Sequence, residues 1–108
     1  MKIDVDVAVI GAGPAGSVSA SMLAEKGHSV MVIEAAQFPR FSIGESLLPQ
    51  VTECLQTAGL LDAVSSAGFQ YKDGAHFVCG DLRETFLFEQ KSAPGPFHAW
   101  EVKRADFD

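Results

Sequence analysis

Cysteine is scarce in this sequence of 108 residues, which contains only Cys54 and Cys79. Two cysteines exclude a disulfide framework and a zinc site built on paired cysteines, so we expect reduced thiols, no metal site and a cytoplasmic protein. Long apolar runs are missing as well, because no stretch reaches the about 18 residues that a membrane-spanning helix requires. The sequence therefore predicts no membrane segment.

Positive charge is also in short supply. Eight Lys and Arg residues stand against 14 Asp and Glu residues, which gives a formal net charge of −6. A surface of that sign repels nucleic acid and anionic membranes, so neither is expected as a partner. Apolar residues are plentiful at 47%, which excludes a disordered chain, and the length allows a single domain.

The first third of the chain has the pattern of a β-α-β unit. The apolar run Val5–Ile10 predicts a buried parallel strand, and 28–34 predicts a second one. Between them a helix is expected over 15–26, with Gly27 as its C-terminal cap. Pro14 suits the first turn of that helix, where the missing N–H costs nothing. The predicted fold class is α/β, with a Rossmann-type unit of about 30 residues.

The remaining elements are shorter. We expect an irregular loop over 35–47, helices over 49–59 and 60–67, a hairpin of strands 75–79 and 85–89 around Gly80-Asp81, a strand over 97–102 and the opening of a helix over 104–108. Two apolar parallel strands need neighbours and cover on both faces. So short a chain buries little core, and we therefore expect residues 1–108 to be the N-terminal part of an incomplete domain.

A glycine pattern joins the first predicted strand to the first predicted helix. Gly11 permits a tight turn, Gly13 lets the backbone approach a pyrophosphate, and Gly16 lets the helix pack close to the strands. The helix begins at Pro14 and Ala15, where free N–H groups and the positive end of the helix dipole favour a phosphate. This context predicts a dinucleotide site.

Glu34 ends the second predicted strand. A carboxylate there accepts hydrogen bonds from both ribose hydroxyls of an adenosine and repels a 2′-phosphate. FAD or NAD is therefore favoured over NADP, and the glycine pattern alone does not separate FAD from NAD.

The run Phe38–Pro49, FPRFSIGESLLP, resembles the flavin-dependent halogenase family and its relatives among FAD-dependent monooxygenases and isoprenoid reductases. The resemblance extends over 5–34, 68–77 and 102–108, and is greatest to halogenases of carrier-bound pyrroles and phenols. It implies an FAD-binding domain, of which 1–108 is the N-terminal part. It also implies an oxidoreductase that uses reduced FAD from a flavin reductase, oxygen and halide on an electron-rich aromatic substrate, either free or bound to a carrier protein.

The resemblance also implies contacts with FAD. Glycines 11, 13 and 16 together with Glu34 would hold the ADP half, and Arg40 would lie along the cofactor. The loop Gly44-Glu45-Ser46 would run beside the flavin toward the halide site, and Arg104 would lie near the cofactor at the head of the next helix. The alternative for Arg40 and Arg104 is that they are surface cations. The alternative for Glu45 is that its carboxylate stabilises the dipole of the helix that follows.

Lys72 is the candidate catalytic residue. Lys72, Gly74 and Phe77 match a Lys-x-Gly-x-x-Phe setting, which in halogenases of this kind implies a lysine that guides hypohalous acid to the substrate. An ammonium group donates hydrogen bonds, and an amine of depressed pKa is a nucleophile. The alternative is an exposed lysine before a strand. An FAD-dependent aromatic hydroxylase, an isoprenoid reductase and a non-catalytic nucleotide-binding fragment remain alternative functions.

Overall fold

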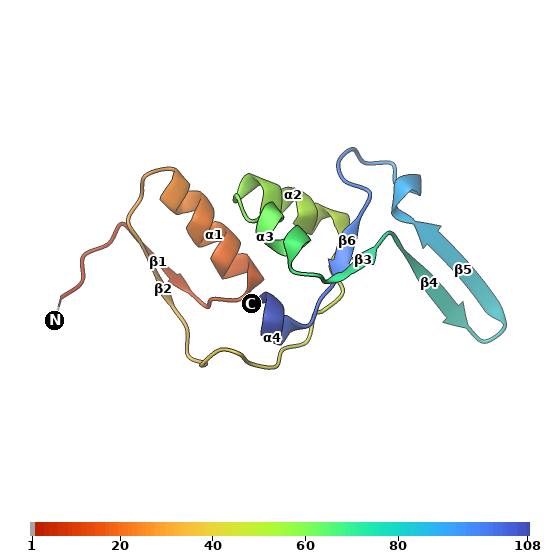
Figure 1. Ribbon diagram of the computed structural model, residues 1–108, viewed down its shortest axis with the longest axis horizontal. Helices are drawn as coiled ribbons and strands as arrows, with labels where there is room; N and C mark the ends of the chain where they lie inside the picture. The colour runs from red at the N-terminus through yellow and green to blue at the C-terminus, as the bar shows by residue number, and fades with distance from the viewer. Residues whose placement is uncertain (1) are drawn as a thin grey trace.

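The predicted β-α-β unit is present at one end of an elongated molecule (Figure 1). In the computed structural model, which describes residues 2–108, strand β1 (Val7–Ile10), helix α1 (Pro14–Glu25) and strand β2 (Val30–Ile33) follow one another. The two strands pair in parallel along their whole length. Pro14 occupies the first turn of α1, and Gly27 has a φ of +88° just after its end. The helix therefore begins and ends one residue earlier than predicted, and Pro14 and Gly27 lie at its two ends as predicted.

The β1–β2 sheet is covered less than the sequence suggests. Within residues 2–108 it has two strands, and α1 packs against both. Its apolar side chains stay in part open to solvent: Ile10 is 78% exposed, Val32 41% and Ile33 45%. The expectation of strands buried on both faces is therefore wrong for this part of the chain, because neither a further strand nor a second helix layer lies against them here.

The centre of the molecule holds its core. Helices α2 (Pro49–Thr57) and α3 (Leu61–Ser66) pack against the antiparallel pair β3 (Gln70–Lys72) and β6 (Ala99–Glu101), with α4 (Arg104–Phe107) beneath them (Figure 1). The buried apolar cluster takes side chains from α2, α3 and β6 and from the residues just before α2 and just after β6: Leu47, Leu55, Val64, Ala99, Trp100 and Val102.

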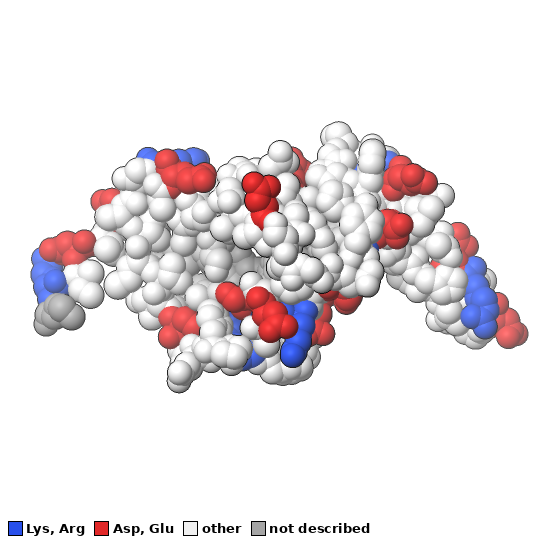
Figure 2. All heavy atoms as spheres, viewed as in Figure 1, with Lys and Arg blue, Asp and Glu red and all other residues white. Residues whose placement is uncertain are grey.

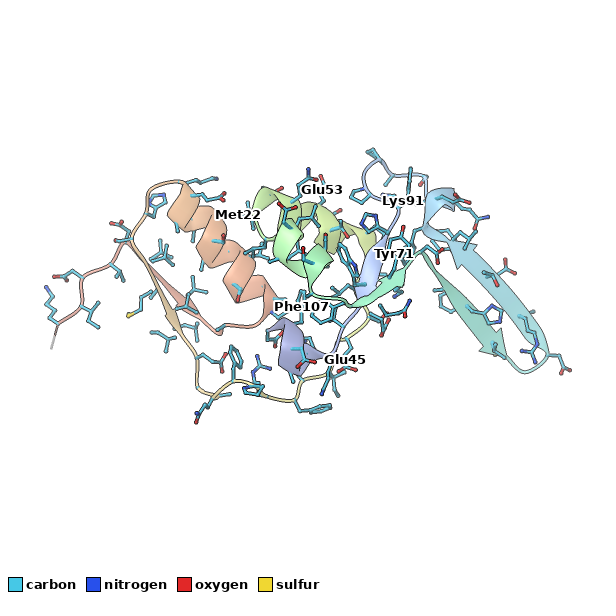
Figure 3. All side chains as sticks on the ribbon, in the orientation of Figure 1. Met22, Glu45, Glu53, Tyr71, Lys91 and Phe107 are labelled. Atoms are coloured by element: carbon cyan, nitrogen blue, oxygen red, sulfur yellow. The ribbon has the colours of Figure 1, made fainter. Side chains whose placement is uncertain are left out.

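Two further side chains fasten this core. Phe107 of α4 turns toward the central elements and meets the ring of Phe69 edge-on at 5.9 Å (Figure 3). The hydroxyl of Thr52, a residue only 2% exposed, donates to the His98 carbonyl at 2.8 Å. That bond satisfies a polar group that would otherwise cost free energy in the core, and it ties α2 to the strand that begins just after His98.

A long hairpin projects from the other end of the molecule (Figure 1). Strands β4 (Gly74–Cys79) and β5 (Leu82–Leu87) pair antiparallel around Gly80, whose φ is +59°. The turn is where the sequence placed it. The second strand begins at 82 instead of 85, and a short 3₁₀ turn, Phe88–Gln90, replaces its predicted end. Strand β3 was not predicted, and β6 is shorter than the predicted 97–102.

The proportions reflect this open arrangement. The radius of gyration is 16.7 Å, compared with about 13 Å for a compact chain of this length. Among residues 2–108, the structure has no helix long and apolar enough to cross a membrane. On the face shown in Figure 2, acidic side chains are spread along the molecule and the basic ones form no continuous patch.

Candidate functional site

The glycine loop, residues 11–16, is shaped by its own backbone. The N–H of Gly11 donates to the Ile33 carbonyl at 2.7 Å, and its φ of +97° turns the chain away from β1. A Cβ on Gly16 would lie 1.9 Å from the Gly11 carbonyl oxygen. Only glycine therefore allows α1 to start so close to the turn, as the sequence predicts for both positions.

Gly13 differs from Gly16, because the protein itself leaves room for a side chain there. Gly13 is the N-cap of α1 with a φ of −74°, a conformation open to any residue. A Cβ would meet Arg40 Nη2 at 3.5 Å and Arg104 Nη2 at 3.6 Å, which are ordinary contacts. The small space beside Gly13 is thus bordered by the positive end of a helix and by two guanidinium groups. Those surroundings suit a phosphate-bearing group.

Glu34 is fixed by backbone groups on both sides. Its Oε2 accepts from the Ala12 N–H at 2.9 Å, and its Oε1 accepts from the Ala36 N–H at 2.8 Å. The hydrogen bond from Ala12, followed by that from Ala36, lowers the pKa of this carboxyl group. Each carboxylate oxygen has a further acceptor position. Glu34 therefore links the glycine loop to the end of β2 and can still accept hydroxyl donors.

Arg40 and Arg104 come from distant segments and meet at Asp108, and we call these three residues the arginine cluster. Arg104 Nε donates to Asp108 Oδ1 at 2.6 Å, and Nη2 donates to Oδ2 at 2.9 Å. Arg40 Nη2 lies 3.3 Å from the same Oδ2. The hydrogen bond to Asp108 raises the pKa of Arg104. Sequence reasoning named both arginines and missed Asp108, although the i,i+4 spacing from Arg104 is the spacing of a helical ion pair.

Arg104 also holds the loop that follows β2. Its Nη1 donates to the Ile43 carbonyl at 2.7 Å. Gly44 has a φ of +97°, and a Cβ there would lie 3.2 Å from the same Nη1. Glu45 lies beside α4 (Figure 3), where its charge also favours the charged form of Arg104. The structure thus brings Gly44 and Glu45 to the arginine cluster.

Residues 45–47 form an extended segment that pairs with the edge of β6 not occupied by β3. The N–H of Val102 donates to the Glu45 carbonyl at 2.8 Å, and the N–H of Leu47 donates to the Trp100 carbonyl at 3.0 Å. Ser46 faces Glu101 in an antiparallel bridge. Three segments far apart in sequence therefore lie side by side in the order 45–47, β6, β3.

The Lys72 side chain extends from β3 across β6 to the segment 45–47. Its Nζ donates to the Ser46 hydroxyl and to the Leu47 carbonyl, the latter at 3.2 Å, and lies 4.0 Å from a Glu101 carboxylate oxygen. The Phe88 ring lies 5.6 Å from the same nitrogen. The Lys72 side chain is 15% exposed, so the alternative of an exposed lysine is wrong. We call Lys72, Ser46, Glu101 and Phe88 the Lys72 cluster.

A shallow hollow lies along the loop between the two clusters. It has a volume of about 350 Å³ and is lined by residues 41–46 and Glu101. Among residues 2–108, no group of three or more His, Cys, Asp and Glu residues could hold a metal ion. The arrangement thus combines two guanidinium groups at the start of α1, a hydrogen-bond acceptor at the end of β2, and a partly buried lysine beyond the connecting loop.

The family model, the related sequences and the solved structures that match this chain all include halogenases. The model of the tryptophan halogenase family matches residues 6–102. A 1H-pyrrole-2-carbonyl-[peptidyl-carrier protein] brominase from Pseudoalteromonas luteoviolacea is 43% identical over 103 residues, which cover 95% of this chain and 24% of the brominase. The chain therefore spans about a quarter of the length of that relative.

Solved structures have the same arrangement of elements. A flavoprotein/dehydrogenase from Cytophaga hutchinsonii matches with a TM-score of 0.90 and 50% identity over 95% of this chain and 25% of that one. The myxobacterial chondrochloren halogenase matches with a TM-score of 0.83 and 39% identity over 95% of this chain and 24% of that one. Together with the family model, these likenesses show that this chain belongs to the tryptophan halogenase family of flavin-dependent halogenases.

Proposed function

We propose that this chain forms the FAD-binding amino-terminal part of a flavin-dependent halogenase. The observation that carries the proposal is the space beside Gly13, bordered by the start of α1 and by the guanidinium groups of Arg40 and Arg104. The chondrochloren halogenase, 39% identical, is described as a variant of FAD-dependent halogenases. The parallel β1–α1–β2 unit, of the Rossmann type, supports the same assignment.

The residues present fit two polar parts of FAD, the charged pyrophosphate and the neutral ribose of its adenosine. The pyrophosphate would lie over Gly13 and at the start of α1, beyond Pro14 and Ala15, where helix N–H groups and both arginines favour negative charge. The adenosine ribose would donate its hydroxyls to Glu34, whose two carboxylate oxygens are held by the Ala12 and Ala36 N–H groups and keep further acceptor positions. FAD, once reduced and bound, supplies the oxygen chemistry of the reaction, and the chain's own residues bind it, orient it and exclude water.

We further propose that Lys72 is the catalytic residue. Its Nζ is held by the Ser46 hydroxyl and the Leu47 carbonyl, at the end of the loop Gly44-Glu45-Ser46 that borders the hollow. This fixed position supports a lysine that holds and directs a small polar reagent toward a substrate, because its donors are already oriented. The substrate is proposed to be an electron-rich aromatic compound, bound to a carrier as in the brominase relative. A flavin reductase and halide are the other proposed partners.

Substitution of Gly13 in the full-length protein tests FAD binding. The Gly13 backbone accepts any residue, so Gly13→Val should fold and place methyl groups where the pyrophosphate would lie. We expect a melting temperature without flavin that is lowered only slightly, by the poorer N-cap of α1, and a loss of FAD affinity of about 100-fold, measured by quenching of flavin fluorescence. Full flavin binding by Gly13→Val would refute the assignment.

The likeness to the Cytophaga flavoprotein/dehydrogenase supports a second candidate, an FAD-dependent oxidoreductase that does not halogenate. An aromatic hydroxylase and an isoprenoid reductase belong to this class. Product analysis separates the two candidates: supply of reduced FAD, oxygen, bromide and a pyrrole bound to its carrier should yield brominated product. Hydroxylated or reduced product alone would favour the second candidate.

The cytoplasmic location stays a prediction.

A further inference from the structure

Asp108 occupies a position that the proposed FAD contacts do not explain. Its side chain is only 1% exposed. Both of its carboxylate oxygens are used: Oδ1 by Arg104 Nε, and Oδ2 by Arg104 Nη2 and also by Arg40 Nη2. A single oxygen atom therefore joins a residue of the loop after β2 to a residue of α4.

The shared oxygen fixes where the two guanidinium groups point. Without an anion between them, Arg40 and Arg104 carry like charges at short range and would move apart into solvent. With Asp108 in place, the Nη2 atoms of both arginines come within 3.5 Å and 3.6 Å of the position that a Cβ on Gly13 would take. The carboxylate thus holds two cations beside the one glycine of the loop that the protein itself does not require.

The donors of Arg104 are not exhausted by these bonds. A guanidinium group has five N–H donors, and Asp108 and the Ile43 carbonyl take three of those of Arg104. One hydrogen remains on Nη2, the nitrogen nearest Gly13. The arginine cluster sums to one positive charge, since Asp108 offsets one of the two arginines. It can therefore still bind an anion while remaining internally fixed.

We propose that Asp108 is the positioning residue that holds Arg40 and Arg104 as a preformed pair for the pyrophosphate of FAD. This inference rests on the proposed FAD binding and adds a residue that touches the arginines and not the cofactor. Preformed donors bind more tightly than free ones, because less side-chain entropy is lost on binding. The role requires a carboxylate, since an amide would present an N–H₂ group to two cations.

The test measures FAD affinity of the full-length protein by flavin fluorescence. Asp108→Asn should bind FAD about tenfold more weakly, on the scale of a lost charge-assisted hydrogen bond. Asp106→Asn is the matched control, because it removes the same charge from an exposed residue of the same helix. It should change the affinity by less than about twofold.

A second background separates positioning from a general loss of structure. In the Arg104→Met protein, Asp108 has lost the partner that takes both of its oxygens, so Asp108→Asn should cost less than about twofold there. A merely structural Asp108 would give the same tenfold loss in both backgrounds, and that result would overturn the inference. An unchanged affinity of Asp108→Asn in the wild-type background would overturn it as well.

The variant Asp108→Glu covers the case in which Asp108→Asn folds poorly. Glutamate keeps the charge, so the FAD affinity of Asp108→Glu should be closer to wild type than that of Asp108→Asn. A glutamate variant no better than the asparagine variant, or no better than Asp108→Ala, would count against a positioning carboxylate. Failure of the wild-type protein to bind FAD would instead refute the proposed function, and with it this inference.

Discussion

The glycine loop and the Lys72 cluster are built in opposite ways. The loop is a continuous run, 11–16, whose shape comes from backbone atoms and the absence of side chains. The Lys72 cluster is assembled from side chains on segments 45–47, β3 and β6, together with Phe88. A site of the first kind is lost as a whole when a Cβ is added at a position that the backbone crowds, such as Gly16. A site of the second kind should weaken in steps as single side chains are changed.

Gly16→Ala is the largest test of this contrast. Its new Cβ would lie 1.9 Å from the Gly11 carbonyl, so α1 must move away from the turn. We expect a loss of stability of about 3 kcal/mol or more and no retained flavin, measured by thermal denaturation and flavin absorbance. Gly27→Ala is the control, because nothing lies within 4 Å of its new Cβ and only the φ of +88° is unfavourable. It should cost about 1 kcal/mol and keep the flavin. Normal flavin binding by Gly16→Ala would contradict a backbone-built loop.

Lys72→Met should give the next largest effect and should leave the glycine loop intact. Methionine keeps the length of the side chain and removes its donors. We expect FAD affinity and oxygen consumption to persist, while halogenated product falls about 100-fold, the scale of one essential polar group.

Lys91→Met is a matched control for Lys72→Met. The Lys91 ammonium also lies 5.6 Å from a phenylalanine ring, that of Phe97, and donates to a carbonyl, that of Pro94. Its backbone N–H donates to the Phe88 carbonyl, but the ammonium that the substitution removes interacts with residues 94 and 97, in the loop beyond the hairpin. Product formation should therefore stay within about twofold of wild type. Unchanged halogenation by Lys72→Met would reject the catalytic role, and loss of flavin by Lys72→Met would show that Lys72 is structural.

Acid should give the smallest effect. Because the pKa of Glu34 is lowered in the folded protein, its hydrogen bonds to Ala12 and Ala36 add stability above the ordinary carboxyl pKa. That stability is lost as the pH falls through the folded value. The difference in melting temperature between wild type and Glu34→Gln should therefore be small at about pH 7 and vanish once the pH has fallen below the lowered pKa of Glu34. Glu53→Gln, whose partner is the Gln50 side chain, is the control. A difference that grows toward low pH would contradict this assignment.

The same contrast explains what the sequence could predict. The glycine loop, Pro14 and Gly27 are local signals, and the β-α-β unit they predicted is confirmed by the parallel pairing of β1 with β2. The hairpin turn at Gly80 was equally local. Each of these features depends on residues that are neighbours in the chain, so a short segment of the sequence contains all the residues that cause it.

The missed features depend on distant residues. Strand β3 is three residues long and becomes a strand only by pairing with β6. Asp108 pairs locally with Arg104, but it acquires its second partner, Arg40, only when the loop after β2 returns to α4. The family resemblance named both arginines and Lys72 without indicating that Ser46 and Asp108 hold them. Spacing along the chain does not reveal a contact made by three segments.

The hairpin gives the Lys72 cluster a mechanical consequence. Strands β4 and β5 are anchored to the rest of the molecule at one end. There the Phe88 N–H donates to the Asp73 carbonyl at 2.7 Å, and Phe88 is buried, with 4% exposed. The Phe88 ring also lies 5.6 Å from the Lys72 ammonium, so the base of the hairpin borders the proposed catalytic lysine. A displacement of the hairpin at this base would therefore change the surroundings of Lys72.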